Sequence, residues 1–110
     1  MGHAAAERRK FERFDLNAPA LLEDEGQKQS IKLFTRDISA GGVFLLAAAP
    51  LAIGAKVKVE IVIPNETIED LTGTRFQLRV YGTVVRIEDS GMAISFKGQA
   101  ILPVGSMMDN

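Results

Sequence analysis

Apolar and polar residues alternate along several short stretches of the chain, a pattern typical of strands with one buried face. The clearest alternation covers residues 56–63, where Val57, Val59, Ile61 and Ile63 are predicted to face inward and the charged residues outward. The same period of two predicts strands at residues 14–22, 29–36, 76–87 and 92–97, and residues 43–46 are predicted to form a short, fully apolar strand. About six strands without a long amphipathic helix predict an all-β barrel or sandwich.

Glycine and proline subdivide this pattern. Pro19 makes the first strand an edge strand, or places its missing N–H at an unpaired position. Residues 23–26 are predicted to form a hairpin turn in which the glycine supplies a positive φ. Residues 37–42 are predicted to interrupt the strand that begins at residue 29. Gly82 is predicted to mark a β-bulge, because the set of inward-facing residues shifts after it.

The 110 residues are expected to form one domain with a single core, since a chain of this length buries roughly two-thirds of its unfolded surface. Residues 1–7 are expected to be a flexible N-terminal segment, and residues 105–110 a frayed C-terminal tail. The polar residues 64–74 are predicted to form a hairpin loop. The apolar residues 101–104 are predicted to cover one end of the barrel.

Composition removes several classes of function. The absence of cysteine excludes disulfides, thiolate metal sites and cysteine nucleophiles, and it is compatible with a reducing compartment. No apolar run approaches the ~18 residues of a membrane-spanning helix, and the N-terminus lacks the apolar core of a signal peptide. We therefore expect a cytoplasmic protein without membrane insertion. A net charge of -1 argues against a general DNA- or RNA-binding domain, so any anion site must be local.

Catalytic chemistry has little support in the sequence. The one histidine is His3 at the N-terminus, so a Ser-His-Asp or Cys-His device is not expected. The carboxylate pairs Asp24–Glu25 and Glu69–Asp70 fall in expected turns, without the apolar surroundings that raise a carboxyl pKa. No spacing of histidines or carboxylates matches a metal site. We expect a protein that is not an enzyme and that needs no metal or cofactor.

Residues 7–13 place four cations and two glutamates just before the first expected strand. Taken alone, this is a solvated charged segment, since exposed ion pairs stabilise little. Alternatively, Arg9 and Arg13 lie four residues apart, so a helical turn or a tight bend places both guanidinium groups on one side. Two guanidinium planes fork onto phosphate oxygens or onto the N7 and O6 edge of guanine, and they also stack on the purine face.

Residues 37–42 have the composition of an ordinary turn, with Asp37 and Ser39 followed by glycines. The same residue types also meet the needs of the other edge of a guanine. An aspartate accepts from the N1 and N2 donors, and a hydroxyl donates or accepts nearby. A glycine such as Gly42 lets the backbone approach a ligand closely.

Together the two segments resemble the PilZ domain family, whose motifs are RxxxR followed about two strands later by (D/N)xSxxG. Residues 9–13 match the first motif and residues 37–42 the second. The later segments 82–86 and 91–96 are also family-like. The resemblance implies a single PilZ-like domain over residues 8–104, folded as a six-stranded antiparallel β-barrel of the split-barrel type.

The resemblance also implies a bacterial receptor for the second messenger cyclic di-GMP. By their positions in the motif, Arg9 and Arg13 would grip phosphate and the Hoogsteen edge of guanine or stack on the base. In the family, an arginine directly before the first motif favours an intercalated pair of ligands, and this chain has Arg8 there. We therefore expect cyclic di-GMP to bind as an intercalated dimer.

The second motif would surround a guanine with Asp37 and Ser39, and Gly42 would allow the backbone turn. Ligand binding is then expected to order the arginine segment against the barrel and to change the surface that a partner sees. The C-terminal helix of many family members is expected to be short or absent here, and no output domain is expected. Signalling would therefore pass through an unidentified downstream protein in motility, biofilm, or pilus or flagellar regulation.

Two other functions stay open at this point. One is a PilZ-like protein-interaction module that is independent of the ligand, although degenerate members of the family usually lose the motif arginines that this chain keeps. The other is a small barrel that binds single-stranded nucleic acid, which needs exposed aromatic residues beside a basic groove. Phe11 and Phe14 are the only aromatic residues near the cations, and the family-like arrangement makes them anchors that pack the segment onto the barrel.

Overall fold

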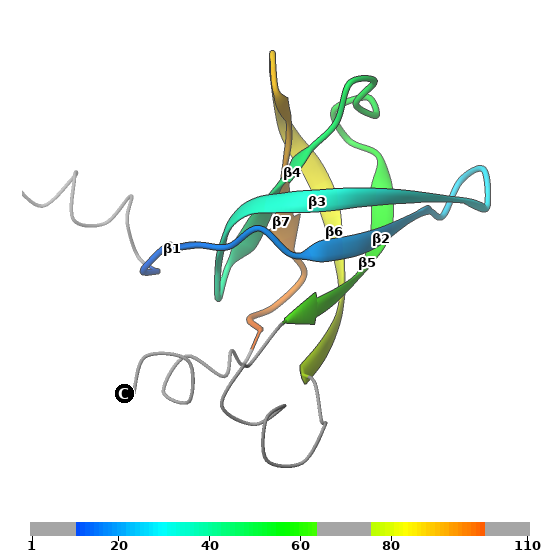
Figure 1. Cartoon of the computed structure of the whole chain (residues 1–110). Helices are drawn as coiled ribbons and strands as arrows, with labels where there is room; N and C mark the ends of the chain where they lie inside the picture. The colour runs from blue at the N-terminus through cyan, green and yellow to red at the C-terminus, as the bar shows by residue number, and fades with distance from the viewer. Residues whose placement is uncertain (1–10, 64–75, 101–110) are drawn as a thin grey trace, which may run out of the picture.

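The computed structural model describes residues 11–63 and 76–100, which form seven strands (Figure 1). They are β1 (Phe14–Asp15), β2 (Pro19–Asp24), β3 (Gln29–Ser39), β4 (Gly42–Leu46), β5 (Lys56–Ile63), β6 (Phe76–Glu88) and β7 (Gly91–Phe96). The expectations for the N-terminal residues 1–7, the 64–74 loop and the C-terminal tail fall outside these ranges. In the part of the chain that is described, no helix has the length and apolar character needed to cross a membrane.

Six of the strands close into an antiparallel barrel, as predicted. Neighbours follow the order β3, β2, β5, β6, β7, β4, and the pairing of β3 with β4 closes the ring. The short strand β1 lies outside this ring and pairs with the C-terminal part of β3, where Phe14 is opposite Ile38. Figure 1 shows β1 and β2 following one another along β3. The chain entering the barrel therefore runs beside the end of β3.

Alternate side chains of the barrel strands fill the interior. In β5, Val57, Val59, Ile61 and Ile63 are at most 1% exposed, which confirms the alternation seen in the sequence. The interior cluster continues through the other strands with Leu22, Ile38, Val43, Leu45, Val84, Met92 and Ile94. Burial of apolar surface stabilises by roughly 25 cal/mol per Å², so these side chains fix which face of each strand points inward.

Pro19 is the first residue of β2, and β2 is an interior strand between β3 and β5. The proline allowed two predictions, an edge strand or an unpaired position for its missing N–H, and the prediction of an edge strand is wrong. Its missing N–H is instead tolerated at the start of the strand, where pairing with β5 begins only at Ala20.

The predicted continuous strand over residues 14–22 is also wrong, because the chain breaks between β1 and β2. The buried Thr35 of β3 spans this break. Its hydroxyl donates to the carbonyl oxygen of Leu16 and accepts the N–H of Ala18 at 2.9 Å. One side chain thus satisfies two backbone groups that a continuous ladder would have paired.

The turn between β2 and β3 is closed by Asp24 rather than by a glycine with positive φ. Its carboxylate accepts the N–H of Gly26 at 2.9 Å, and its carbonyl oxygen accepts the N–H of Lys28. The positive φ of this turn, 60°, belongs to Lys28. Asp24 is also buried, at 8% exposure, and not solvated as expected. Its role as a turn cap explains the burial, because a buried carboxylate needs such donors.

The motif segment 37–42 does not interrupt β3, so this prediction is wrong. β3 continues to Ser39, and only Ala40 and Gly41 form the turn into β4. The irregularity lies earlier: the register with β4 shifts between Thr35 and Asp37, which leaves Arg36 as an extra, bulged residue.

The bulge at Arg36 reverses which residues of β3 face the interior. Leu33 packs against the core before the bulge and Ile38 belongs to the core after it, so the inward positions change from odd to even numbers. Asp37 and Ser39 therefore lie on the outer side of the barrel. Without the extra residue, both polar side chains would point into the apolar interior.

β6 contains a second bulge. Its register with β7 shifts between Val84 and Arg86, which leaves Val85 as the extra residue. The predicted shift of the inward set is confirmed, but Gly82 is not the bulge, because it pairs in register with both neighbouring strands. A Cβ at Gly82 would lie 2.5 Å from the carbonyl oxygen of Ser95, so glycine is required there by the close approach of β7.

Candidate functional site

The last residues before β1 contact the end of β3 on the outer face of the barrel. Arg13 donates from Nη1 to Oδ1 of Asp37 at 2.7 Å, which joins the first motif to the second. The Arg13 side chain is 55% exposed and that of Asp37 only 12%, so the aspartate is the more enclosed partner. Arg8 and Arg9, the other arginines predicted for the site, lie outside the described residues.

Asp37 is shared with a second arginine that the sequence pattern did not single out. Arg36 donates from Nε to the other carboxylate oxygen, Oδ2, at 2.9 Å. This bond, the largest of several causes, raises the pKa of Arg36 above its ordinary value. Both oxygens of Asp37 thus accept a charge-assisted hydrogen bond, which fixes the plane of the carboxylate. The sequence feature that could have identified Arg36 is its position directly before the motif aspartate.

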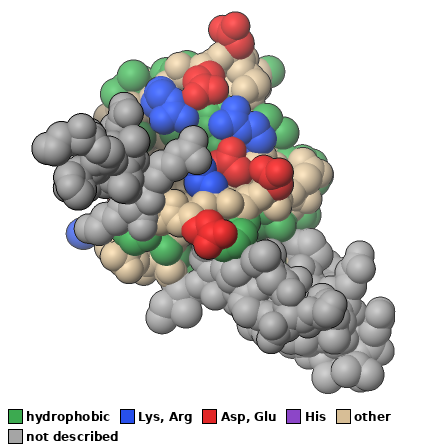
Figure 2. Space-filling view, turned by 90° about the vertical axis from the view of Figure 1, so that its left-hand side faces the viewer, with side chains coloured by type: hydrophobic (Ala, Val, Ile, Leu, Met, Phe, Trp, Pro, Cys, Tyr) green, Lys and Arg blue, Asp and Glu red, His purple; other side chains and the backbone are tan. Residues whose placement is uncertain are grey.

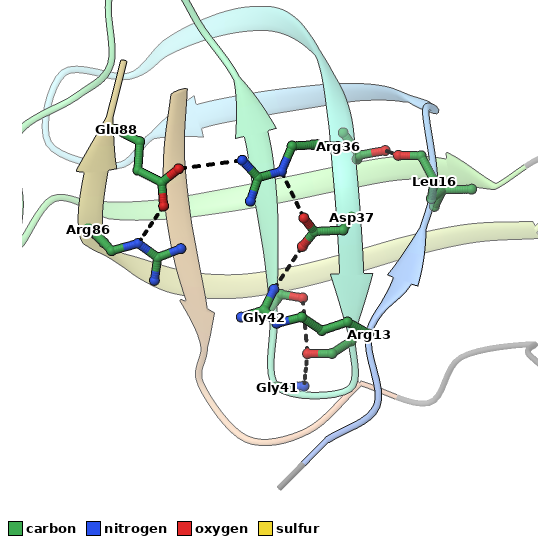
Figure 3. A network of polar contacts seen from close by, with 10 residues as sticks. Arg13, Leu16, Arg36, Asp37, Gly41, Gly42, Arg86 and Glu88 are labelled. Carbon is green, nitrogen blue, oxygen red and sulfur yellow. Dashed lines mark hydrogen bonds and ion pairs between the residues drawn. The ribbon is translucent and has the colours of Figure 1, made fainter. Parts of the chain in front are cut away.

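The ion pairs continue from β3 to the end of β6 (Figure 3). Arg36 also donates from Nη1 to Glu88 at 3.4 Å, and Arg86 donates from Nε to the other oxygen of Glu88 at 2.8 Å. The hydrogen bond from Arg86 is the main cause that lowers the pKa of Glu88 below its ordinary 4.5. Arg13, Asp37, Arg36, Glu88 and Arg86 therefore form one chain of alternating charge.

This alternation is visible on the surface. Figure 2 shows basic and acidic side chains next to one another around a small apolar patch on the face of the molecule that it presents. The ion pairs make the network a local concentration of guanidinium groups whose charge is partly compensated by Asp37 and Glu88. It fits a chain whose net charge is only -1.

Ser39 uses its hydroxyl within the turn that follows it. The oxygen Oγ accepts the N–H of Gly41 at 3.1 Å and lies 3.5 Å from the carbonyl oxygen of Gly42. Gly42 is needed for a different reason than the turn we expected it to allow. A Cβ there would lie 2.4 Å from the carbonyl oxygen of Ile94 in β7, so only glycine permits this approach of the two backbones.

Phe11 packs against the turn between β3 and β4, as expected for an anchor. A Cβ built on Gly41 would lie 2.6 Å from Cδ2 of the Phe11 ring, so the ring occupies the space that a side chain at position 41 would fill. Phe14 packs against the core cluster. The two phenylalanines thus hold the chain on both sides of Arg13.

These residues surround a pocket of about 290 Å³ on the outside of the barrel. Its lining includes Phe11, Arg13, Ser39, Gly42, Arg86 and Ala93. The structure therefore brings together three of the predicted site residues at the pocket, and Asp37, which is not among the lining residues, is paired with Arg13. Arg86 was not predicted, and its signal in the sequence was only its membership of the family-like segment 82–86.

The groups around the pocket are guanidinium, carboxylate, hydroxyl and an aromatic ring. No cluster of three or more His, Cys, Asp or Glu side chains placed to hold a metal ion occurs among residues 11–63 and 76–100. Guanidinium groups beside a carboxylate can hold a planar ligand that carries both an anion and hydrogen-bond donors.

A closed six-stranded barrel with a cationic pocket on its outer face defines the chain as a small β-barrel domain. A family model described as PilZ domain matches residues 7–102, and the chain belongs to this family. Both motif segments lie within the matched range. The PilZ domain is a known receptor fold for cyclic di-GMP.

Solved structures with the same fold include three that are similar over most of this chain. The Bacillus subtilis inhibitor of motility, MotI/DgrA, has a TM-score of 0.67 at 20% identity over 90% of this chain, which spans only 46% of that protein. The PilZ domain of CeSA from a cellulose-synthesizing bacterium has a TM-score of 0.54 at 16% identity, with 87% of each chain covered.

The third is the PilZ domain of YcgR from Escherichia coli, solved with c-di-GMP, at a TM-score of 0.54 and 16% identity over 90% of this chain and 83% of that one. At these identities the likeness establishes the fold alone. A comparison with curated protein sequences gave no significant match.

Proposed function

We propose that this PilZ domain is a receptor for cyclic di-GMP that acts without catalysis. The observation that carries the proposal is the 2.7 Å ion pair between Arg13 and Asp37, which joins the two family motifs at the edge of the pocket. The ligand would be held by Arg9, Arg13, Asp37, Ser39 and Gly42, with Arg8 beside them. All six positions belong to the two motifs or directly precede them.

The ion pairs suggest how the ligand enters. Asp37 is held at Oδ2 by Arg36, so its plane stays fixed when Oδ1 changes partner. The N1 and N2 donors of a guanine then compete with Arg13 for Oδ1. Arg13, with its side chain 55% exposed, is released to swing onto a phosphate or onto the Hoogsteen edge of the base. One carboxylate therefore exchanges an internal cation for the ligand.

Release of Arg13 links binding to the shape of the surface. The segment that carries it is attached through Phe11 and Arg13, and a bound ligand would add contacts to Arg8 and Arg9. We infer that the ligand orders this segment against the barrel and binds as an intercalated pair. A downstream protein in the cytoplasm would recognise the changed surface, in the regulation of motility, biofilm, or pili or flagella.

Isothermal titration calorimetry with cyclic di-GMP tests the proposal. We expect saturable binding with about two ligands per protein, and weaker or no binding of GMP and cyclic di-AMP. Arg9→Ala, Arg13→Ala and Asp37→Ala should each weaken binding at least about tenfold, since a bidentate guanidinium contact to guanine is worth about 1–3 kcal/mol.

The matched control is Arg79→Ala, which removes an arginine from an ion pair with Glu60 on β5, outside the motifs and the pocket. It should bind like the wild type. An absence of both heat and thermal shift with cyclic di-GMP would refute the receptor and favour the ligand-independent interaction module. Normal binding by Arg13→Ala and Asp37→Ala would refute the site.

A further inference from the structure

Asp37 and Arg86 stand at the two ends of one row that crosses four strands. Asp37 pairs with Phe44, Phe44 with Ala93, and Ala93 with Arg86. The neighbours of Phe44 and Ala93 along their strands belong to the interior cluster, so this row lies on the outer face. The motif aspartate and an arginine from the opposite side of the site thus share one surface.

Arg86 reaches this surface because of the bulge at Val85. Val84 belongs to the interior cluster, so Arg86 and Glu88 would also point inward if the strand continued without the extra residue. The bulge in β3 has the same consequence for Asp37. Bulges recur where a strand must redirect a side chain toward a site. Here the bulge in β6 turns Arg86 toward the pocket, and the bulge in β3 turns Asp37 toward Arg13, which lines the same pocket.

The terminal nitrogens of Arg86 are available to a ligand. Of the Arg86 nitrogens, only Nε donates to Glu88, at 2.8 Å, and within the described residues neither Nη1 nor Nη2 of Arg86 donates a hydrogen bond. Figure 3 shows this end of the side chain directed away from Glu88. Arg86 lines the pocket together with Arg13, and Ala93 beside it is small. Exposed ion pairs contribute little to stability, so stability alone gives little reason for the pair with Glu88.

The pocket continues past the bulge. Val85 and Ser95 line both the 290 Å³ pocket and a larger cleft of about 720 Å³, whose other walls include Lys56, Tyr81 and Lys97. Sites for ligands of drug size usually have ≈ 300–1,000 Å³, so a dinucleotide has room only if it extends beyond the smaller pocket. Such a ligand would pass beside Arg86.

We propose that Arg86 is a further ligand-binding residue, which donates its terminal nitrogens to a phosphate or to the N7 and O6 edge of a guanine from the side opposite Arg13, while Glu88 positions it. This inference rests on the proposed function for the identity of the ligand. It adds a binding residue outside both motifs. The general class of ligand is a guanine nucleotide, because its phosphate and its Hoogsteen edge both accept from a guanidinium fork.

Titration of cyclic di-GMP into the wild type, Arg86→Ala, Arg86→Lys and Arg79→Ala tests the assignment. Arg86→Ala should bind at least about tenfold more weakly, and its affinity should depend less on salt because one charged contact is lost. Arg86→Lys should be intermediate, since lysine keeps the charge but not the fork. Arg79→Ala should match the wild type. Equal binding by wild type and Arg86→Ala overturns the inference and leaves the receptor intact.

Glu88 is tested as a positioning residue by a double-mutant cycle. Glu88→Ala should weaken binding several-fold in the wild type and have a much smaller effect in Arg86→Ala, because it acts mainly through that arginine and its contact with Arg36 is longer, at 3.4 Å. If the effects of Glu88→Ala and Arg86→Ala on binding are additive, Glu88 does not position Arg86. Thermal unfolding of each variant checks the fold. If Arg86→Ala does not fold, Arg86→Gln replaces it, and normal binding by that variant overturns the inference.

Failure of the receptor can be told apart from failure of this inference. If cyclic di-GMP does not bind, the same variants are titrated with GMP and with the linear dinucleotide pGpG. Binding of either that is lost in Arg86→Ala supports the role of Arg86 without the receptor. No binding of any guanine nucleotide by the wild type overturns both.

Discussion

The guanidinium carbon of Arg36 lies 3.7 Å from the centroid of the Phe44 ring. Phe44 is fully buried although it faces the outer side of the barrel, because Arg36 covers it. The same arginine holds Asp37 and Glu88, so the bulge in β3 is held by a cation–π contact and two ion pairs at once. A cation over an aromatic face adds attraction to this packing.

This arrangement predicts that Phe44 is a stabilising residue of the site and not only of the fold. Phe44→Ala should lower the free energy of unfolding by about 3–5 kcal/mol, as for other buried phenylalanines. Phe34→Ala is the control, because Phe34 is 51% exposed on the same pair of strands, and its cost should stay near 0.5 kcal/mol. Chemical denaturation measures both. Equal costs for the two variants would contradict the burial of Phe44 under Arg36.

Thr35 provides a second prediction, because its hydroxyl connects β1 to β2. Thr35→Val keeps the shape but leaves the carbonyl oxygen of Leu16 and the N–H of Ala18 without their partner. The expected cost is about 1–3 kcal/mol of unfolding free energy. Ligand binding should weaken as well, because the segment with Arg13 leads directly into β1.

Thr83→Val is the matched control for this change. Thr83 is half-buried in β6, and its hydroxyl forms no hydrogen bond with the described residues. Its denaturation midpoint should stay close to that of the wild type. A loss of stability in Thr83→Val as large as in Thr35→Val would show that the hydroxyl bridge is not the cause.

The adjacent glycines of the second motif should respond differently to alanine. At Gly42 the new Cβ would meet backbone, 2.4 Å from the carbonyl oxygen of Ile94, so Gly42→Ala should cost about 1–3 kcal/mol. At Gly41 it would meet side-chain atoms alone, those of the Phe11 ring, which can rotate aside more easily than backbone. Gly41→Ala should therefore change stability by only about 0.5 kcal/mol but weaken ligand binding. Thermal unfolding measures the loss of stability in both variants, and calorimetry measures the loss of ligand binding. Equal losses of stability in the two variants would contradict the prediction.

The barrel could be predicted from the sequence because its strands follow period two closely. Val57 to Ile63 have the alternation and the burial that the pattern required. The errors fall where a polar side chain replaces backbone pairing. Thr35 spans a break that the alternation of residues 14–22 hid, and Asp24 caps a turn that we assigned to glycine. Periodicity reports burial but not the partner of a hydrogen bond.

The site could be predicted only as far as its motifs extend. Arg13 and Asp37, which belong to different motifs, form an ion pair although 24 residues separate them. Arg36 and Arg86 were not predicted because their positions depend on the two bulges, and a bulge changes the direction of side chains without a distinctive residue type. The sequence signal for a bulge was the shift, after Gly82, in which residues are apolar and face inward.

The last prediction concerns the titration of Glu88. Its pKa lies below 4.5 in the folded protein, mainly through the hydrogen bond from Arg86. A carboxyl whose pKa is lowered by folding contributes stability above its unfolded pKa and loses that contribution as the pH falls through the folded pKa. Arg86→Ala should raise the pKa of Glu88 toward 4.5 and reduce the acid sensitivity below that pH.

The carboxyl chemical shift of Glu88, measured by NMR, follows this titration directly. The measurement should run from about pH 2 to about pH 7, which brackets the ordinary pKa of a carboxyl group. Arg79→Ala should leave the Glu88 midpoint unchanged, since Arg79 pairs with Glu60. A smaller rise is expected in Arg36→Ala, because the contact of Arg36 with Glu88 is longer, 3.4 Å against 2.8 Å for Arg86. If Arg36→Ala moves the midpoint more than Arg86→Ala does, the main partner of Glu88 is Arg36, and Arg86 is not held in the position that a contact with the ligand requires.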